Sequence, residues 1–187
     1  FEQMFGGFMR ILGIDPGLTR CGVGVVDLNS NRRASFVGVH VVRTPSTNEL
    51  PLRLLELETG LGELFELYQP DAVAIERVFS QHNVRTAMGT AQASAVAMLL
   101  AARNHLEAAM YTPTEVKAAV TGSGRANKVQ VAEMVKRLLS LKEIPKPVDS
   151  TDALALAICH IWRGTGNTKL ESAVAAEKLR LAKLVGK

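Results

Sequence analysis

The sequence predicts an α/β fold: a mixed sheet of five strands flanked by helices. Three segments with strand-like alternation follow one another at the start of the chain, and helical and strand patterns then alternate up to residue 162. The 187 residues are 47% hydrophobic and 21% charged, which is the composition of a globular domain. No apolar run reaches 18 residues, so we expect no helix that spans a membrane.

The first three strands are expected at residues 9–15 (MRILGID), 21–28 (CGVGVVDL) and 34–44 (ASFVGVHVVRT). Pro16 and Gly17 form a turn between the first two strands. Strands joined by such short connections pair side by side, so this part of the chain is predicted to be an antiparallel meander.

Helices and strands alternate after the meander. Apolar residues recur with a helical period from residue 48 to 68, with Pro51 in the first turn, and a short buried strand is expected at 71–76. An Ala-rich helix at 86–104, a strand at 107–112 and a short helix at 113–122 follow, and the small residues of the Ala-rich helix permit close packing. Further helices are predicted at about 127–141 and at 150–162, separated by Pro145 and Pro147.

We expect a single domain over residues 9–165. Residues 1–8 are interpreted as a short vector-derived leader, with Met9 as the natural start. Residues 166–187 have helical propensity and are expected to form either a packed helix or a frayed tail. Cys21 and Cys159 have neither the number nor the spacing of a disulfide framework or a zinc site, which favours a reducing cytoplasm.

Positive charge is concentrated in one part of the chain. The formal net charge is +4, and residues 103–146 alone hold eight Lys or Arg against four Glu. The remainder of the chain is neutral overall. A basic region of this kind indicates an anionic partner such as nucleic acid, and its alternative is a solvated, helix-rich face.

Two strands end in an acidic residue. Period-2 alternation places Asp15 on the same sheet face as Ile11, and Glu76 on the same face as Ala72. In α/β sheets, ligands usually bind at the carboxyl ends of the strands. Both acids also have structural interpretations: Asp15 precedes a Pro-Gly turn, and Glu76 is close to Arg77 in the sequence.

Two further acids open the last predicted helix. Asp149 and Asp152 stand at i and i+3 and project from the same side of its first turn, and Leu156 and Cys159 continue that side. Asp152 is therefore expected to point inward, where a charged acid needs a cation. The structural alternative is an N-cap at Asp149 and a dipole-compatible acid at Asp152. Taken together, four acids at the end of one sheet favour a site for divalent metal.

Four segments, in this order and spacing, resemble the RuvC family of Holliday-junction resolvases. They are ILGIDPGLTRCGVGVVD, AIERVFSQHNVRTAMGTAQA, TPTEVKAAVTGSGRANK and DSTDALALAICHIW, and the match runs from about Met9 to Trp162. The resemblance implies a ribonuclease-H-like fold and a metal-dependent crossover junction endodeoxyribonuclease. Such an enzyme resolves four-way DNA junctions by paired symmetric nicks that leave 5′-phosphate and 3′-hydroxyl ends, in recombination and repair.

By position, Asp15, Glu76, Asp149 and Asp152 match the metal-binding catalytic acids of this family. Oxygen ligands favour two Mg²⁺ ions per active site, with Mn²⁺ as a substitute. We assign Asp15 to both ions, Glu76 to one ion, and the two remaining acids to the other.

The resemblance also implies contacts to DNA. Phe79 matches an aromatic residue that contacts bases at the junction, and Lys117 and Lys128 match lysines needed near the DNA. Arg85 and Arg125 are further candidate DNA contacts. We also expect Gly17, which has no side chain, to leave room for an approaching phosphate. The implied partners are four-way junction DNA, a second copy of the chain in a homodimer, and a branch-migration motor of the RuvA and RuvB type.

Two other classes of function are alternatives. The segment DPGLTRCG also resembles the first phosphate loop of the actin and sugar-kinase superfamily, but that interpretation requires a second Asp-x-Gly loop and a second domain, which 187 residues do not provide. A module that binds junctions without cutting them is the other alternative. The presence of all four acids argues against it, because acids repel phosphate.

Overall fold

The computed structural model describes residues 8–31, 33–77, 84–146 and 150–164, without the side chains of Val84 and Arg85. The predicted C-terminal helix or tail, and the predicted leader apart from Phe8, lie outside these residues and stay predictions. No helix in the described ranges is long and apolar enough to cross a bilayer.

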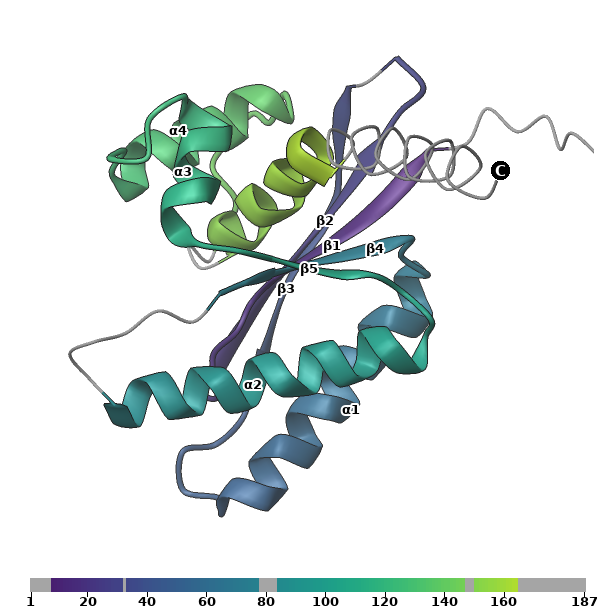
Figure 1. Ribbon diagram of the computed structural model, residues 1–187, viewed down its shortest axis with the longest axis vertical. Coiled ribbons are helices and arrows are strands. Elements are labelled where there is room, and N and C mark those ends of the chain that lie inside the picture. Colours follow the sequence, from purple (N-terminus) through teal and green to yellow (C-terminus); the bar gives the residue numbers. More distant parts are fainter. Residues whose placement is uncertain (1–7, 32, 78–83, 147–149, 165–187) are drawn as a thin grey trace, which may run out of the picture.

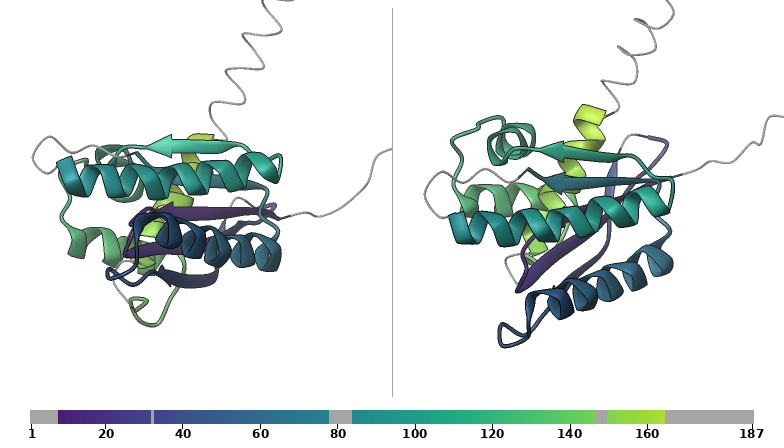
Figure 2. Two further views of the ribbon diagram at one scale, coloured as in Figure 1. Left: turned by 90° about the horizontal axis from the view of Figure 1, so that it is seen from below. Right: turned by 60° about the horizontal axis from the view of Figure 1, so that its bottom comes forward.

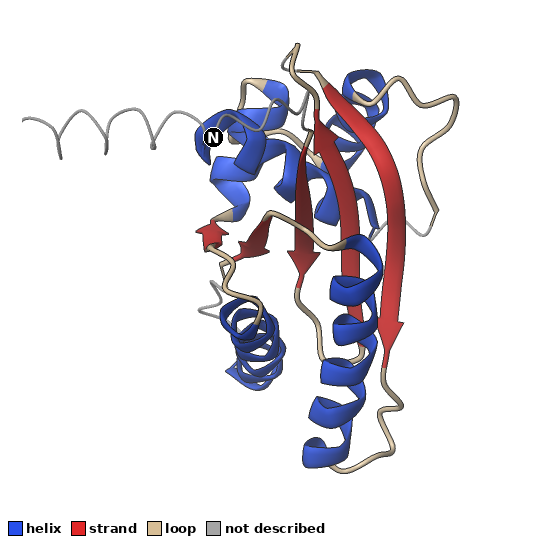
Figure 3. Ribbon diagram, turned by 90° about the vertical axis from the view of Figure 1, so that its right-hand side faces the viewer, coloured by secondary structure: helices blue, strands red, loops and turns tan. Residues whose placement is uncertain are grey.

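Five strands form one mixed sheet in the order β3-β2-β1-β4-β5. The strands are β1 (Met9–Asp15), β2 (Arg20–Leu28), β3 (Ala34–Arg43), β4 (Ala72–Glu76) and β5 (Ala108–Tyr111). The first three pair antiparallel, whereas β4 pairs parallel with both β1 and β5. The sheet passes from the long strands of the meander to two short strands (Figure 3). The predicted α/β fold with a mixed five-stranded sheet is confirmed.

Helices cover both faces of the sheet (Figure 1). Helices α1 (Leu50–Tyr68) and α2 (Val84–Arg103) lie side by side on one face, as Figure 2 also shows. On the other face lie α3 (Pro113–Thr121), α4 (Lys128–Leu138) and the helix formed by residues 150–164. Each helix begins or ends within about three residues of its prediction.

Alternation along the strands sends successive side chains into two separate cores. Leu12, Ile14 and Val73 pack with α1 and α2, where Ala93 and Ala97 of α2 are fully buried. These small residues let α2 lie close to the sheet, as predicted. The second core contains side chains of β1 and β4, of α3 and α4, and of helix 150–164, namely Ile11, Ala72, Ala74, Val116, Val131, Val135, Leu154 and Ile158.

Candidate active site

The central strands bring the first two predicted acids to one edge of the sheet. Strands β1 and β4 are parallel neighbours, and Ile14 is paired with Ile75. Asp15 and Glu76 are the next residues along each strand, so both stand at the carboxyl ends and on the same face. The alternation predicted from the sequence is therefore confirmed, and the face is the one covered by α3, α4 and helix 150–164.

Two glycines let helix 150–164 reach this edge. A Cβ atom at Gly13 would lie 2.0 Å from the carbonyl oxygen of Ala153, and one at Gly24 would lie 2.5 Å from the amide nitrogen of Leu154. The backbone of the helix therefore rests directly on β1 and β2, in a space that no side chain could share. This contact places the first turn of the helix, with Asp152, beside the acids of the strands.

The acids line a cavity of about 340 Å³ together with two lysines. Asp15, Glu76 and Asp152 form its acidic part, and Lys117 of α3 and Lys128 of α4 supply the positive charge. Apolar residues complete the wall: Pro113, Val116, Val131, Ala155 and Leu156. Five of the residues that the sequence assigned to the site thus meet in one place.

Both lysines are carried by helices with well-defined starts. Thr112 forms a capping box with Glu115 at the start of α3, and Asn127 forms one with Gln130 at the start of α4. Lys128 is the first residue of α4, so its position follows directly from the cap at Asn127. Such caps typically stabilise a helix start by about 1 kcal/mol each.

Burial and the neighbouring carboxylates raise the pKa of Glu76 from 4.5 to about 7. Burial is the largest cause, followed by the negative charges of Asp15 and Asp152 and by a hydrogen bond that protonated Glu76 donates to Asp15, whereas Lys128 acts in the opposite direction. The Nζ atom of Lys128 lies 3.0 Å from Oδ2 of Asp152. A cation therefore meets the inward-pointing Asp152, as its position required.

The donor set fits a hard divalent cation. Asp15 and Glu76 offer oxygen ligands at adjacent strand ends, and the negative charges of Asp15 and Asp152 contribute, after burial, to the raised pKa of Glu76. Within the described ranges, no three His, Cys, Asp or Glu side chains are grouped so that they could hold a metal by themselves. Asp149, the fourth predicted ligand, lies outside those ranges.

The other predicted residues stand elsewhere or are not described. Phe79 lies outside the described residues, and Arg85 belongs to the first turn of α2, where its side chain is not described. Arg125 lines a different cavity of about 490 Å³ between α3 and α4, together with Arg137 and Glu133. The structure thus does not bring Arg125 to the acidic cavity.

A network that the sequence did not reveal fixes the turn after Asp15. Nε of Arg53 donates to Oγ1 of Thr44 (2.9 Å), and Nη2 donates to Oγ1 of Thr19 (2.7 Å). The buried hydroxyl of Thr44 donates in turn to the carbonyl oxygen of Leu18 (2.6 Å). The three side chains come from the turn, β3's end and α1, so no local sequence pattern signals the contact.

Gly17 has a role in the turn itself. A Cβ atom there would lie 2.3 Å from the carbonyl oxygen of Arg20, so the turn closes only with glycine at this position. Access for a phosphate, which the sequence suggested as the reason, is not needed to explain the residue.

The order of the strands in the sheet is that of a ribonuclease-H-like fold. Carboxylates at the ends of two central parallel strands, in one cavity with two lysines, are the site of a nuclease with this fold. The family model described as crossover junction endodeoxyribonuclease RuvC matches residues 11–160. The chain therefore belongs to the RuvC family, as its four motifs indicated.

Individual relatives agree with this assignment. The RuvC of Streptomyces avermitilis is 63% identical over 167 residues, which cover 89% of this chain and 95% of that protein. The RuvC of Salinispora arenicola is 60% identical, and the match covers 92% of this chain and 97% of that protein. Among solved structures, Thermus thermophilus RuvC in complex with a Holliday junction substrate superposes with a TM-score of 0.80 at 32% identity, covering 86% of this chain and 97% of that one. The yeast mitochondrial resolvase Ydc2, at 16% identity and a TM-score of 0.59, shares the fold.

Proposed function

We propose that this chain cuts four-way DNA junctions by paired, symmetric hydrolysis of phosphodiester bonds, and that the acidic cavity is its active site. The observation that carries the proposal is the meeting of Asp15, Glu76 and Asp152 with Lys117 and Lys128 around one cavity. Membership of the RuvC family, and the similarity to a relative solved with a Holliday junction substrate, support it.

In this mechanism the acids would hold Mg²⁺, with Mn²⁺ as a substitute. Asp15, on the central strand, would contribute to both ions, Glu76 to one, and Asp152 together with Asp149 to the other. Such ions would lower the pKa of water and stabilise charge on the attacking and leaving oxygens. Hydrolysis joins the water oxygen to phosphorus and breaks the bond from phosphorus to the 3′ oxygen, which takes up a proton, so the products are 5′-phosphate and 3′-hydroxyl ends.

The two lysines, which line the same cavity as the acids, act on the phosphate. Lys128 is anchored at the start of α4 and its side chain is 73% exposed, so it can reach a phosphate at the mouth of the cavity. Lys117 lines the same cavity from α3. Both lysines supply positive charge close to the negative charge that develops on the phosphate oxygens in the transition state. This is the usual function of cations in phosphoryl transfer.

We also propose a homodimer, because a four-way junction has approximate two-fold symmetry and needs one site for each symmetry-related strand. Exposed apolar side chains on α2 support this: Met88, Met98 and Leu99 are 58%, 36% and 50% exposed, and Met88 and Leu99 lie on the same side of the helix. Cooperation with a branch-migration motor of the RuvA and RuvB type and a location in the bacterial cytoplasm complete the proposal.

Three further residues are proposed to contact the junction. Phe79 is expected to stack on bases, since it follows Glu76 by three positions. Arg85, in the first turn of α2, and Arg125, in the cavity between α3 and α4, are proposed as phosphate contacts.

The test is a cleavage assay on a synthetic four-way junction, with and without Mg²⁺, beside a linear duplex of the same sequence. We expect paired nicks in the junction only when Mg²⁺ is present, and little cutting of the duplex. Tight junction binding without cutting at any Mg²⁺ or Mn²⁺ concentration would instead identify a binding module. Equal cutting of the duplex would refute selectivity for the junction.

A further inference from the structure

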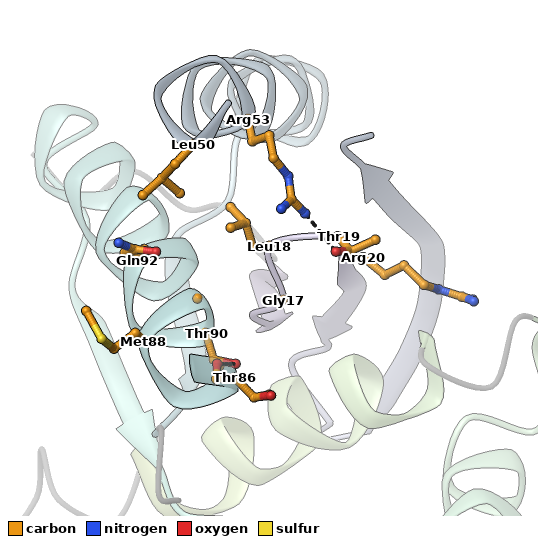
Figure 4. A pocket seen from close by; sticks show the side chains of 11 residues that line it. Gly17, Leu18, Thr19, Arg20, Leu50, Arg53, Thr86, Met88, Thr90 and Gln92 are labelled. Carbon is orange, nitrogen blue, oxygen red and sulfur yellow. Dashed lines mark hydrogen bonds between the residues drawn. The ribbon is translucent and has the colours of Figure 1, made fainter. Parts of the chain in front are cut away.

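A second hollow lies on the other face of the sheet, directly beyond the turn that follows Asp15 (Figure 4). Its volume is about 620 Å³. The walls come from residues 17–20 of the turn, from Leu50 and Arg53 of α1, and from residues 86–92 of α2. We call it the turn groove. None of its lining residues is Asp or Glu.

Arg53 gives the turn groove a fixed positive charge. The side chain reaches from α1 toward the turn, where Thr19 accepts one of its hydrogen bonds (Figure 4), and Thr44 accepts another. A guanidinium carries five N–H donors, so these bonds leave others for a ligand. Within the described part of the chain, no carboxylate forms an ion pair with Arg53. A cation held in one orientation loses little entropy when it binds a phosphate.

Two helices direct their N-termini at the turn groove. Leu50 and Arg53 belong to the first turn of α1, and Thr86 to the first turn of α2. Neither first turn contains an acidic residue, and the acid at these helix starts is Glu49, the N-cap residue of α1. The helix dipoles therefore add positive potential to that of Arg53, and this combination attracts anions.

The turn groove and the acidic cavity adjoin the same short segment. Asp15 lines the cavity, and Gly17 to Arg20 line the groove, so one turn separates the two hollows. A chain of phosphates that crosses the carboxyl ends of β1 and β4 would thus pass from one to the other.

We propose that the turn groove binds a phosphodiester segment of the junction strand outside the scissile bond, with Arg53 as a phosphate contact. This inference rests on the proposed function, because it takes DNA as the substrate. It adds a contact surface on the α1 and α2 face to the lysines of the opposite face. Arg53 also donates hydrogen bonds that hold the turn after Asp15. A phosphate bound to Arg53 therefore lies close to the segment that carries this catalytic acid.

Thr90 allows a test that leaves Arg53 and its network intact. It lines the turn groove, and its hydroxyl donates to the carbonyl oxygen of Thr86 within its own helix (3.0 Å). Thr59 on α1 is a matched control outside the groove, because it is exposed and its hydroxyl makes the same bond to Leu55 (2.9 Å). The four variants are Thr90→Glu, Thr90→Lys, Thr59→Glu and Thr59→Lys.

Binding of a fluorescent four-way junction is measured in EDTA by anisotropy, at several salt concentrations. We expect Thr90→Glu to weaken binding and Thr90→Lys to strengthen it, each by about three- to tenfold, with the salt slope of Thr90→Lys steeper by about one. The Thr59 variants should stay within about twofold of the wild type. Cleavage at saturating junction should be within about twofold of the wild type for the Thr59 variants, because Thr59 lies outside both the acidic cavity and the turn groove.

The outcomes separate the possible occupants. If the Thr90 variants bind junction as the Thr59 variants do, while the wild type binds and cuts normally, the groove proposal is wrong and the proposed function stands. A shift in the monomer–dimer equilibrium by sedimentation, with DNA affinity unchanged per dimer, would assign the groove to a second copy of the chain and overturn the proposal. If the wild type neither binds nor cuts junctions, the proposed function itself fails.

Discussion

Replacement of Glu76 by Gln tests the electrostatics of the acidic cavity without any substrate. In the folded protein the pKa of Glu76 is raised from 4.5 to about 7, chiefly because the side chain is buried and secondarily because Asp15 and Asp152 are negative. The folded protein keeps this proton between about pH 4.5 and pH 7, whereas the unfolded chain releases it. Stability therefore falls as the pH rises through this window and changes no further above it.

The size of the effect follows from the same pKa. One pKa unit corresponds to about 1.4 kcal/mol, so the charged form of Glu76 costs the metal-free protein at most about 3 kcal/mol at pH 8. Glutamine keeps a hydrogen-bond donor for Asp15 but carries no charge. Glu76→Gln should consequently unfold like the wild type near pH 4.5 and be more stable by about 1–3 kcal/mol at pH 8.

Urea denaturation in EDTA at pH 4.5, 6, 7 and 8 measures this difference. Glu63→Gln, at an exposed position of α1, is the control and should change the free energy of unfolding by less than about 0.5 kcal/mol at every pH. Addition of Mg²⁺ should stabilise the wild type more than Glu76→Gln, because only the wild type offers the ion a carboxylate at position 76. A variant that is less stable than the wild type at pH 8, or a difference that does not vary with pH, would refute the reasoning.

Four further substitutions have distinct expected results. Asp15→Asn should reduce junction cleavage at least about a hundredfold yet leave binding in EDTA unchanged, and cutting near the wild-type rate would contradict its assignment as a metal ligand. Lys128→Ala should change the free energy of unfolding by less than about 1 kcal/mol, because Lys128 is largely exposed where it pairs with Asp152. The same substitution should lower the rate of cleavage about tenfold or more. Cleavage at the normal rate would identify Lys128 as a solvated helix lysine. Gly13→Ala should destabilise the protein by about 2–3 kcal/mol or more and abolish cleavage, because its Cβ would overlap the carbonyl oxygen of Ala153. Gly62→Ala is expected to have the opposite effect on stability, because no atom lies within 4 Å of its Cβ. It should stabilise α1 by about 0.5–1 kcal/mol in thermal or urea unfolding.

The elements of the fold were predictable because their signals are local. Alternation placed Asp15 and Glu76 on the correct face, and their strand ends were correct to the residue. The end of α4 was predicted about three residues too late, because Ser140 adopts a left-handed φ of 52° and the helix stops at Leu138. Nothing about Ser140 in the sequence marks that conformation.

Contacts between distant segments were less predictable. The resemblance supplied the roles of Lys117 and Lys128, yet the ion pair of Lys128 with Asp152 joins residues 24 positions apart and depends on how α4 packs. The network of Arg53 with Thr44 and Thr19 gave no signal at all, since hydroxyl residues and arginines at such spacing are common on surfaces. The turn groove depends on three elements that only the tertiary structure brings together.

The close contact of helix 150–164 with Gly13 and Gly24 also orders events during protein synthesis. Asp15 and Glu76 leave the ribosome early, whereas Asp152 belongs to the last element that the structure describes. A nascent chain that ends before residue 150 lacks Asp152. It also lacks the helix backbone that packs against Gly13 of β1 and Gly24 of β2. The set of acids is therefore completed only when the chain has been made past residue 152 and helix 150–164 has packed on the sheet.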